Sequence, residues 1–417
     1  MRKLFLSIIA LTLSAGLWAE TQSVKYIDAD GQQKTVTATV VTNETGTLSN
    51  GWYVVLDEVS RGTITCNGDV HLILADGAKL TAQGGNSSPG VHVPCARSRL
   101  TIYGQTNQTG ELNANGGLYC AGIGGGNRGF GSDITINGGT VNATGGDKGA
   151  GIGGGTRGFG SHITINGGTV NAIGGDGGAG IGGGNGYAPG VYEDDDGKTG
   201  SGYNILIFGG TVNATGGGGG AGIGGGCFAN GSNISIYGGT VTASGGDDAD
   251  AIGGGHSRHI GSNIVVDADC RVLAGDNSTS TSEIKHTSDT DLASELSKRY
   301  AFIEIDRNII QELQSAAIAA IDEVIAGVNE VIAGVNNVII LDFAQKAKNR
   351  ITNATNRTAI TAIKDSAITE LDTLIKTHKS ALGELGEEKA GTAVKVTKGD
   401  TEVILYAPEK VEYIIRK

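Results

Sequence analysis

The sequence predicts a right-handed parallel β-helix, and three observations lead to that fold class. The motif AGIGGG begins at Ala121, Ala150, Ala179 and Ala221, and an altered copy, DAIGGG, begins at Asp250. The copies are 29 residues apart, except for one step of 42 that corresponds to one period plus an insertion. β-Branched residues alternate with other residues between the glycine runs. A regular period of about 20–50 residues indicates stacked repeats, each too small to fold alone.

Two columns of strand-like segments recur inside this period. The first column holds Ile- and Val-rich triplets at 134–136, 163–165, 205–207, 234–236 and 264–266. The second column reads TVNAT, TVNAI, TVNAT and TVTAS, starting at Thr140, Thr169, Thr211 and Thr240. Because successive strand residues point to opposite faces, we expect the Val and Ala of each copy to face inward and the Thr and Asn outward.

Glycine and proline usage supports the same fold class. The chain has 73 Gly and only 4 Pro among 417 residues. A coil must turn corners, and Gly adopts positive φ at little steric cost. Interior strands use every N–H group, which disfavours Pro. Glycine does not occur at every third position, so a collagen-like chain is excluded.

The first residues and the overall charge bear on location and partners. Arg2 and Lys3 precede an apolar run, so residues 1–19 are expected to be an export signal that is cleaved after Ala19. No later stretch reaches about 18 apolar residues, and no transmembrane span is expected. The net charge of −12 disfavours nucleic acid and anionic membranes as partners. We therefore expect a secreted or cell-surface protein.

The five cysteines are Cys66, Cys95, Cys120, Cys227 and Cys270. Export permits disulfides, and Cys66 and Cys95 lie one period apart, but the odd count leaves at least one cysteine outside any internal bridge. The spacings of Cys and His do not match a zinc site. A buried, small hydrophobic side chain is the expected role of each cysteine.

Strand-like segments also precede the first AGIGGG copy. They include GWYVV, GDVHLILADGAKLTA and LTIYGQ, and ELNA at Glu111 lies one period before TVNA at Thr140. Together with the repeated AGIGGG and GGTVNATGG, these motifs resemble a family of exported bacterial proteins described as carbohydrate-binding-domain-containing. The resemblance covers roughly residues 24–275. It implies a pectate-lyase-like β-helix architecture and a glycan partner, and it brings no catalytic residues.

The composition changes after Gly275. A Ser/Thr-rich stretch is expected to be a linker, and apolar residues then recur at helical spacing, with EVIAGVN at Glu323 repeated from Glu330. We expect a small three-helix module and then a short C-terminal β segment. The expected segments are a signal peptide (1–19), a cap with the β-helix (20–275), a linker with a strand (276–300), the helical module (301–390) and the β segment (391–417).

Side chains near one edge of the coils are candidates for ligand binding. Arg and Phe recur in NRGFGSD and TRGFGSH, one coil apart, and the 13-residue insertion adds tyrosines that would extend that surface. Three consecutive aspartates in the insertion weakly resemble a calcium loop, and no other cofactor is expected. The candidate ligand-binding residues are Arg128, Phe130, Asp133, Arg157, Phe159, His162, Tyr187, Tyr192 and Tyr203, and the candidate calcium residues are Asp194, Asp195 and Asp196.

Three functions remain open at this stage. The favoured one is a non-enzymatic carbohydrate-binding or adhesin-like β-helix of a bacterial cell surface. A polysaccharide lyase or hydrolase acting on pectin-like glycans needs clustered carboxylates, for which Asp147, Asp176 and Asp247 in one turn column are candidates. An ice-binding protein would use the outward Thr and Asn grid, with about 4.8 Å between coils. The identity of any glycan is left open.

Overall fold

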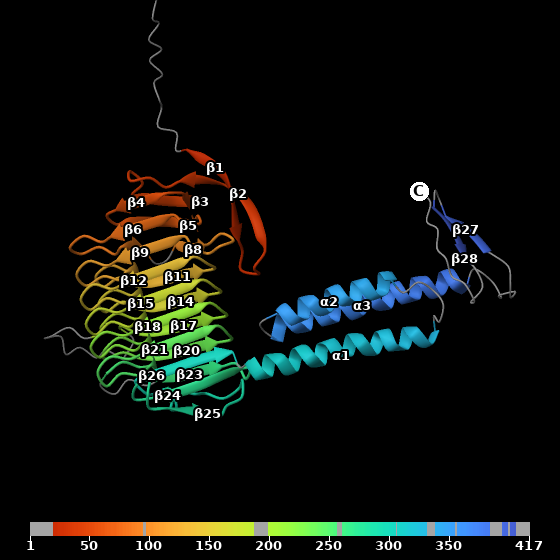
Figure 1. Cartoon of the computed structure of the whole chain (residues 1–417). Coiled ribbons are helices and arrows are strands. Elements are labelled where there is room, and N and C mark those ends of the chain that lie inside the picture. The colour runs from red at the N-terminus through yellow and green to blue at the C-terminus, as the bar shows by residue number, and fades with distance from the viewer. Residues whose placement is uncertain are drawn as a thin grey trace, which may run out of the picture. The chain divides into compact units, whose positions relative to one another are not determined.

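The computed structural model describes residues 20–94, 97–186, 199–256, 261–305, 307–331, 338–354, 357–383, 394–398 and 401–405. The described chain divides into two compact units, and the boundary in the sequence falls between Glu304 and Ile305. The first unit is a parallel β-helix whose coils stack in order along the chain (Figure 1). The predicted fold class is therefore confirmed, since parallel coils are followed by three helices and a short β hairpin.

Each repeat is one coil of three strands. The AGIGGG motif gives a two-residue strand, and the Ile column and the TVNAT column give longer ones. The short strands are β10 (Ile123–Gly124), β13 (Ile152–Gly153), β16 (Ile181–Gly182), β19 (Ile223–Gly224) and β22 (Ile252–Gly253). The Ile-column strands are β11 (Gly131–Ile136), β14 (Gly160–Ile165), β17 (Gly202–Ile207), β20 (Gly231–Ile236) and β23 (Gly261–Val266). The third strands are β12 (Thr140–Thr144), β15 (Thr169–Ile173), β18 (Thr211–Thr215), β21 (Thr240–Ser244) and β24 (Cys270–Gly275).

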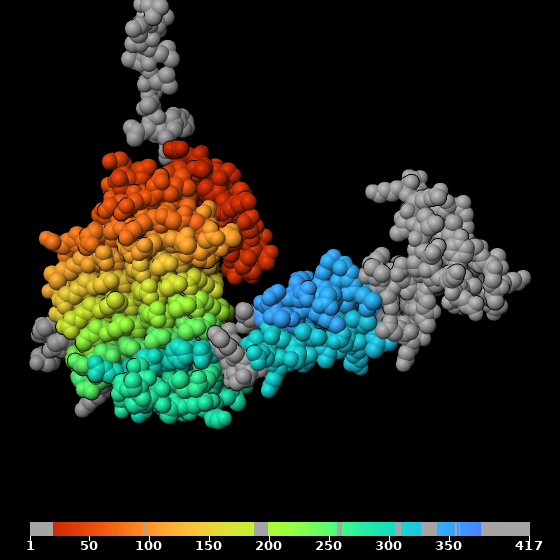
Figure 2. All heavy atoms as spheres, in the orientation of Figure 1, coloured from red at the N-terminus to blue at the C-terminus, as the bar shows by residue number. Residues whose placement is uncertain are grey.

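The pairing register equals the sequence period. Val141 pairs with Val170, and Val170 pairs with Val212 across the insertion. These valines are fully buried, as are the stacked isoleucines of the other two columns, such as Ile123 and Ile134. The coil interior is thus a set of aliphatic ladders, and the expected inward-facing Val and Ala positions are correct. Figure 2 shows the coils packed along the chain with no break between neighbours.

The AGIGGG motif is glycine-rich because coils approach closely there. Gly153 has φ of 130°, and a Cβ atom on it would lie 2.0 Å from the carbonyl oxygen of Gly182 in the next coil. A side chain of any size would push the two coils apart at this corner. The repeat therefore keeps glycine where the backbone itself forms the contact between coils.

The third residue of each Ile-column strand is left out of the pairing on both neighbouring strands, without a shift in register, and we call it the bulge residue. The register skips this position between β11 and β14, and its residues have positive φ of 51–58°. Asn, Asp and His are the non-glycine residues that tolerate this conformation best. The bulge residues are Asp133, His162, Asn204, Asn233 and Asn263.

The N-terminal strands start the solenoid and cover its first coil. β5 is long enough to pair with both β7 and β8, so it links two columns that separate in later coils. The hairpin of β1 and β2 is antiparallel, unlike the coils. The strands are β1 (Thr21–Ile27), β2 (Gln33–Val40), β3 (Thr47–Val55), β4 (Glu58–Arg61), β5 (Ile64–Leu74), β6 (Lys79–Gln83), β7 (Val91–His92), β8 (Arg99–Tyr103) and β9 (Glu111–Asn115).

The solenoid ends with a strand that returns in the opposite direction. The sequence predicts a linker with a strand at 276–300. This segment contains β25 (Thr281–Ile284) and the first residue of β26 (Tyr300–Ile305), which continues into the range where the helical module was expected. β25 pairs with β24, and β26 inserts between β24 and β21, antiparallel to β21. Leu292 and Leu296 between them are fully buried. This segment closes the last coil.

The altered repeat at Asp250 belongs to this closure. In the four earlier copies the N–H of the fifth motif residue, such as Gly225, donates to a carbonyl of the following coil. In the last copy the N–H of Gly254 donates instead to Asp250 Oδ2 at 2.7 Å. Asp291 acts similarly on β23, because its carboxylate accepts from the N–H groups of Asn263 and Ile264. Both carboxylates replace acceptors that a further coil would supply.

The second unit contains three helices and a hairpin. The helices are α1 (Arg307–Val331), α2 (Val338–Asn353) and α3 (Arg357–Gly383), and they share a core that includes the fully buried Ile321, Ile351 and Leu371. β27 (Val394–Lys398) and β28 (Thr401–Leu405) pair antiparallel. Within the described residues, no helix combines the length and apolar character needed to cross a bilayer.

The described cysteines are free thiols in the interior. Cys66, Cys120, Cys227 and Cys270 are buried and unbridged, and Cys95 lies outside the described residues. Burial raises the pKa of Cys66 and of Cys270 to about 12. Neutral buried thiols of this kind pack as small hydrophobic side chains, as the sequence predicts.

Candidate functional site

The predicted Arg/Phe edge consists of Arg128, Phe130, Arg157 and Phe159, together with the bulge residues Asp133 and His162. The structure brings its rings together: Phe130 and Phe159 are stacked, with ring centroids 4.5 Å apart and planes 9° apart. Phe130 is 39% exposed and Phe159 is half-buried, so the pair lies on the surface. Tyr203 joins it, 6.1 Å from Phe159 and 6.2 Å from His162 in T-shaped contacts.

The stacking limits what this edge offers to a sugar. A pyranose ring packs its C–H surface against an aromatic face, but Phe130 and Phe159 each cover one face of the other. Tyr203 meets Phe159 in a T-shaped contact. One face of each Phe is therefore unavailable to a sugar. Tyr187, Tyr192 and the candidate calcium residues Asp194, Asp195 and Asp196 lie outside the described residues.

A second aromatic pair was missed by the sequence reasoning. Phe208 and Tyr237 stack at 4.9 Å and are 48% and 44% exposed. Each follows an Ile-column triplet directly, one period apart, and this shared position was the available signal. In earlier coils the same position holds Asn137 and Asn166, whose side chains hydrogen-bond at 2.7 Å.

The outward Asn column is a hydrogen-bonded ladder. Asn142 donates to Asn113 at 2.8 Å, Asn171 to Asn142 at 2.7 Å, and Asn213 to Asn171 at 2.8 Å. Each Asn side chain thus donates its amide N–H to the Asn of the preceding coil, so this column links the coils to one another. This ladder breaks up the flat Thr grid that an ice-binding surface would present.

The candidate catalytic carboxylates do not converge on one cleft. Asp147 and Asp176 occupy neighbouring turns of one column, Gly218 takes the next turn and Asp247 the one after it. Of the three aspartates only Asp247 lines the groove described below. Among the described residues, no cluster of three or more His, Cys, Asp or Glu side chains could hold a metal ion. Burial raises the pKa of Asp250 to about 6, but this carboxyl accepts the Gly254 N–H at the end of the solenoid. Its environment is explained by that closure.

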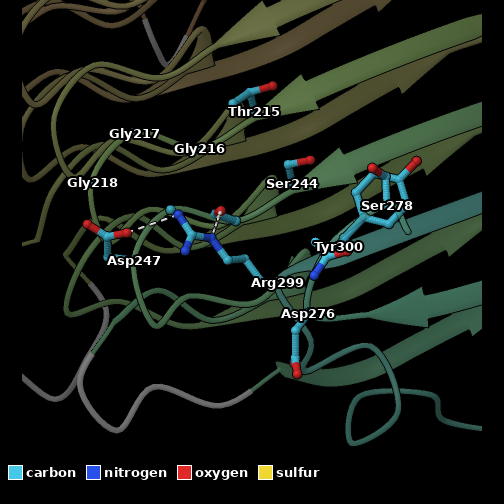
Figure 3. Close-up of a pocket in the computed structure, with 13 residues that line it drawn as sticks. Thr215, Gly216, Gly217, Gly218, Ser244, Asp247, Asp276, Ser278, Arg299 and Tyr300 are labelled. Atoms are coloured by element: carbon cyan, nitrogen blue, oxygen red, sulfur yellow. Dashed lines mark hydrogen bonds and ion pairs between the residues drawn. The ribbon is translucent and has the colours of Figure 1, made fainter. Parts of the chain in front are cut away.

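A groove lies where the third strands end, beside the returning strand β26. Its volume is about 540 Å³, and we call it the strand-end groove (Figure 3). It is lined by residues 215–218, 244–247, 276–278 and 299–300. Pairing register aligns Thr215, Ser244 and Tyr300 side by side at its floor. Hydroxyls from adjacent strands and one aromatic ring thus meet in one hollow.

Charged side chains lie along the same groove. Arg299 reaches toward Asp247, with Nη2 2.9 Å from Oδ1, and its Nε donates to the carbonyl of Gly245 at 3.4 Å (Figure 3). Asp276 is the second carboxylate of the lining. Both Arg299 and Asp247 are more than half exposed, so they are accessible to a ligand.

Sequence reasoning missed most of this groove. It singled out Asp247 as a member of a turn column, but Arg299, Tyr300 and Asp276 lie in the segment 276–300, where a linker with a strand was expected. Their contribution depends on β26 returning to pair with β21, about 60 residues earlier in the chain. Local periodicity carries no signal for such a long-range pairing.

Comparison with known families agrees with this architecture. A family model described as Beta helix repeat matches residues 110–127, 134–156, 163–185, 205–227 and 234–256. The matched segments are the coils that carry AGIGGG and the two strand columns. These segments therefore carry β-helix repeats, in agreement with the parallel β-helix of the structure. No curated protein and no solved structure matches it.

Proposed function

We propose that this protein is a secreted β-helix that binds a glycan without transforming it, as a carbohydrate-binding or adhesin-like component of a bacterial surface. The observation that carries the proposal is the strand-end groove. It joins hydroxyls, a tyrosine ring, carboxylates and a guanidinium in about 540 Å³. Polar groups that converge around an aromatic ring suit a polyhydroxylated ligand.

The rigid coils favour binding over catalysis at this position. The groove floor is built from paired strands, so Thr215 and Ser244 are fixed in register before a ligand arrives. Preorganised hydroxyls reduce the entropy cost of binding. The lining carboxylates Asp247 and Asp276 are exposed, unlike the desolvated acid that glycoside cleavage requires.

The test is a glycan array probed with the mature chain and two matched variants. Thr215→Trp fills the groove, while Thr144→Trp adds the same ring two coils away in the same register row, outside the groove. We expect the first variant to lose at least about tenfold in affinity, which is about 1.4 kcal/mol, and the second to bind normally. Equal binding by both variants would refute the groove as the glycan-binding site. Release of reducing or unsaturated sugar would establish an enzyme instead.

The Arg/Phe edge is a second candidate surface with its own test. Phe130→Ala combined with Phe159→Ala removes the stacked pair. Because both rings lie at the surface, the expected loss of stability is about 1–2 kcal/mol, below the roughly 3–5 kcal/mol of a buried Phe. Thermal unfolding measures the stability, and the array measures binding. Loss of glycan binding without loss of the fold would place a ligand on this edge.

A further inference from the structure

The backbone N–H groups at the glycine corners of the strand-end groove already donate hydrogen bonds within the protein. The N–H groups of its glycine corners donate to carbonyls of neighbouring segments: Gly216 to Ser244, Gly217 to Gly178, Gly245 to Arg299 and Gly246 to Gly220, all at 2.8–2.9 Å. The glycine-rich lining thus differs from a helix N-terminus or phosphate loop, where N–H groups point at an anion. The glycine-rich lining therefore provides few free backbone N–H groups that could bind an anionic ligand.

The charged side chains of the groove also disfavour an anionic ligand. Asp247 and Asp276 contribute two carboxylates, and Arg299 contributes one guanidinium that already faces Asp247 at 2.9 Å. Lys298 precedes Arg299 in sequence but does not line the groove. A uronic acid would have to displace Asp247 from Arg299 and would still meet a second carboxylate. The groove therefore has an excess of negative charge and of acceptors.

From this balance we infer that the groove selects a glycan that brings donors of its own: an oligosaccharide of amino sugars with free ammonium groups, rather than a polyuronate. The inference rests on the proposed glycan-binding function and names its ligand class. The ammonium groups interact with Asp276 and Asp247, and the sugar hydroxyls with Thr215, Ser244 and Tyr300. It separates this protein from β-helices that act on acidic pectins.

The experiment compares three hexasaccharides of similar length with the mature full chain by calorimetry. They are a β-1,4-glucosamine hexamer, its neutral glucose counterpart and a galacturonate hexamer. We expect affinity to decrease in that order. The advantage of the glucosamine hexamer should shrink as salt is raised, because exposed charge pairs are screened. Tightest binding of the galacturonate hexamer would overturn the inference and leave glycan binding intact. Absence of binding to any glycan on the array would refute the proposed function itself.

Two substitutions test the assigned charges. Asp276→Asn should weaken glucosamine-hexamer binding by about three- to fivefold and leave the glucose hexamer unchanged, as expected for one exposed ion pair. Asp247→Asn removes the partner of Arg299, so it should weaken the glucosamine hexamer and strengthen the galacturonate hexamer. Asp147→Asn, at the equivalent turn three coils earlier and outside the groove, is the control. If both groove variants bind all three sugars as the control does, the charge assignment is wrong.

Discussion

At the residue scale, small departures from the repeat have specific structural reasons. Asp250 stands where the earlier copies have Ala, and its carboxylate accepts the N–H of Gly254, which has no following coil to donate to. The bulge residues are Asp, His and Asn because their backbone is left-handed there. Asp291, like Asp250, accepts backbone N–H groups at the end of the solenoid. Burial acts to raise its pKa, yet hydrogen bonds from the N–H groups of Ile264, Asn263 and Ala293 leave that pKa lowered.

Asp250 makes stability depend on pH. Its folded-state pKa is raised to about 6, above the value of about 4 expected in the unfolded chain. The folded state therefore holds an extra proton in this window, and stability should fall as pH rises from about 4 to about 6. Asp250→Asn keeps an acceptor for Gly254 and should abolish that slope. Asp250→Ala leaves the N–H unpaired and should be about 1–3 kcal/mol less stable than Asp250→Asn.

Unfolding of the three proteins at pH 4.5 and pH 7 measures both effects. The Asn and Ala variants lack the same carboxyl, so their difference isolates the hydrogen bond. A wild-type slope that persists in Asp250→Asn would assign the pH dependence to another group.

At the element scale, β26 connects the closure of the solenoid to the groove. Its Ile303 is fully buried opposite Val241, and its first residue, Tyr300, lies in the groove. An inserted antiparallel strand also covers the edge of β21, which would otherwise present unpaired backbone groups. One short strand thus covers the end of the coil stack and completes the lining of the strand-end groove.

Ile303→Ala should weaken that strand selectively. Loss of a fully buried Ile costs about 2–5 kcal/mol. We expect the amides of β21 and β24 to exchange faster with deuterium, while the coils around β12 keep their protection, because solenoid stability is local. Glycan binding should weaken in parallel. Uniform loss of protection along the whole β-helix would argue against a local closure.

The helices form the second element-scale case. Their core residues, such as Ile321, Ile351 and Leu371, contact one another within the unit that begins at Ile305. Expressed alone from Ile305 to Lys417, this unit should give a helical circular dichroism spectrum and a cooperative melt. Leu371→Ala should lower its stability by about 2–5 kcal/mol. A disordered spectrum of the wild-type fragment would show that the helices require the β-helix or a partner.

At the scale of the whole molecule, the coil is the unit of construction. Each coil contacts its two neighbours through the same ladders, so stability is close to a sum over coils and interfaces. The chain should therefore tolerate the loss of a complete period better than the loss of part of one.

Deletion of residues 150–178 removes one period and joins Gly149 to Ala179, which restores the native Gly-Ala junction. We expect a folded β-helix whose melting temperature falls by only a few degrees. Deletion of residues 150–164, about half a period, should prevent folding of the coils on either side, because inward and outward positions no longer match. Circular dichroism and size-exclusion chromatography distinguish the outcomes. If the two deletion variants fold equally well, the coil is not the unit from which the β-helix is built.

The sequence by itself determined the period, the coil, the inward Val and Ile columns and the place of the glycine corners. These follow from local rules, since strand alternation and left-handed backbone geometry act within a few residues. It also located the stacked Phe130 and Phe159, because residues one period apart must become neighbours. The same rule would have found Phe208 and Tyr237.

Only the tertiary structure decided the strand-end groove and the closure of the solenoid. Arg299 and Tyr300 reach Asp247 and Ser244 because β26 turns back and pairs antiparallel with β21. The role of Asp250 as the acceptor for the Gly254 N–H likewise arises because no further coil follows it. Such pairings join distant segments without a shared period, so their free energy depends on packing between elements that local sequence patterns do not encode.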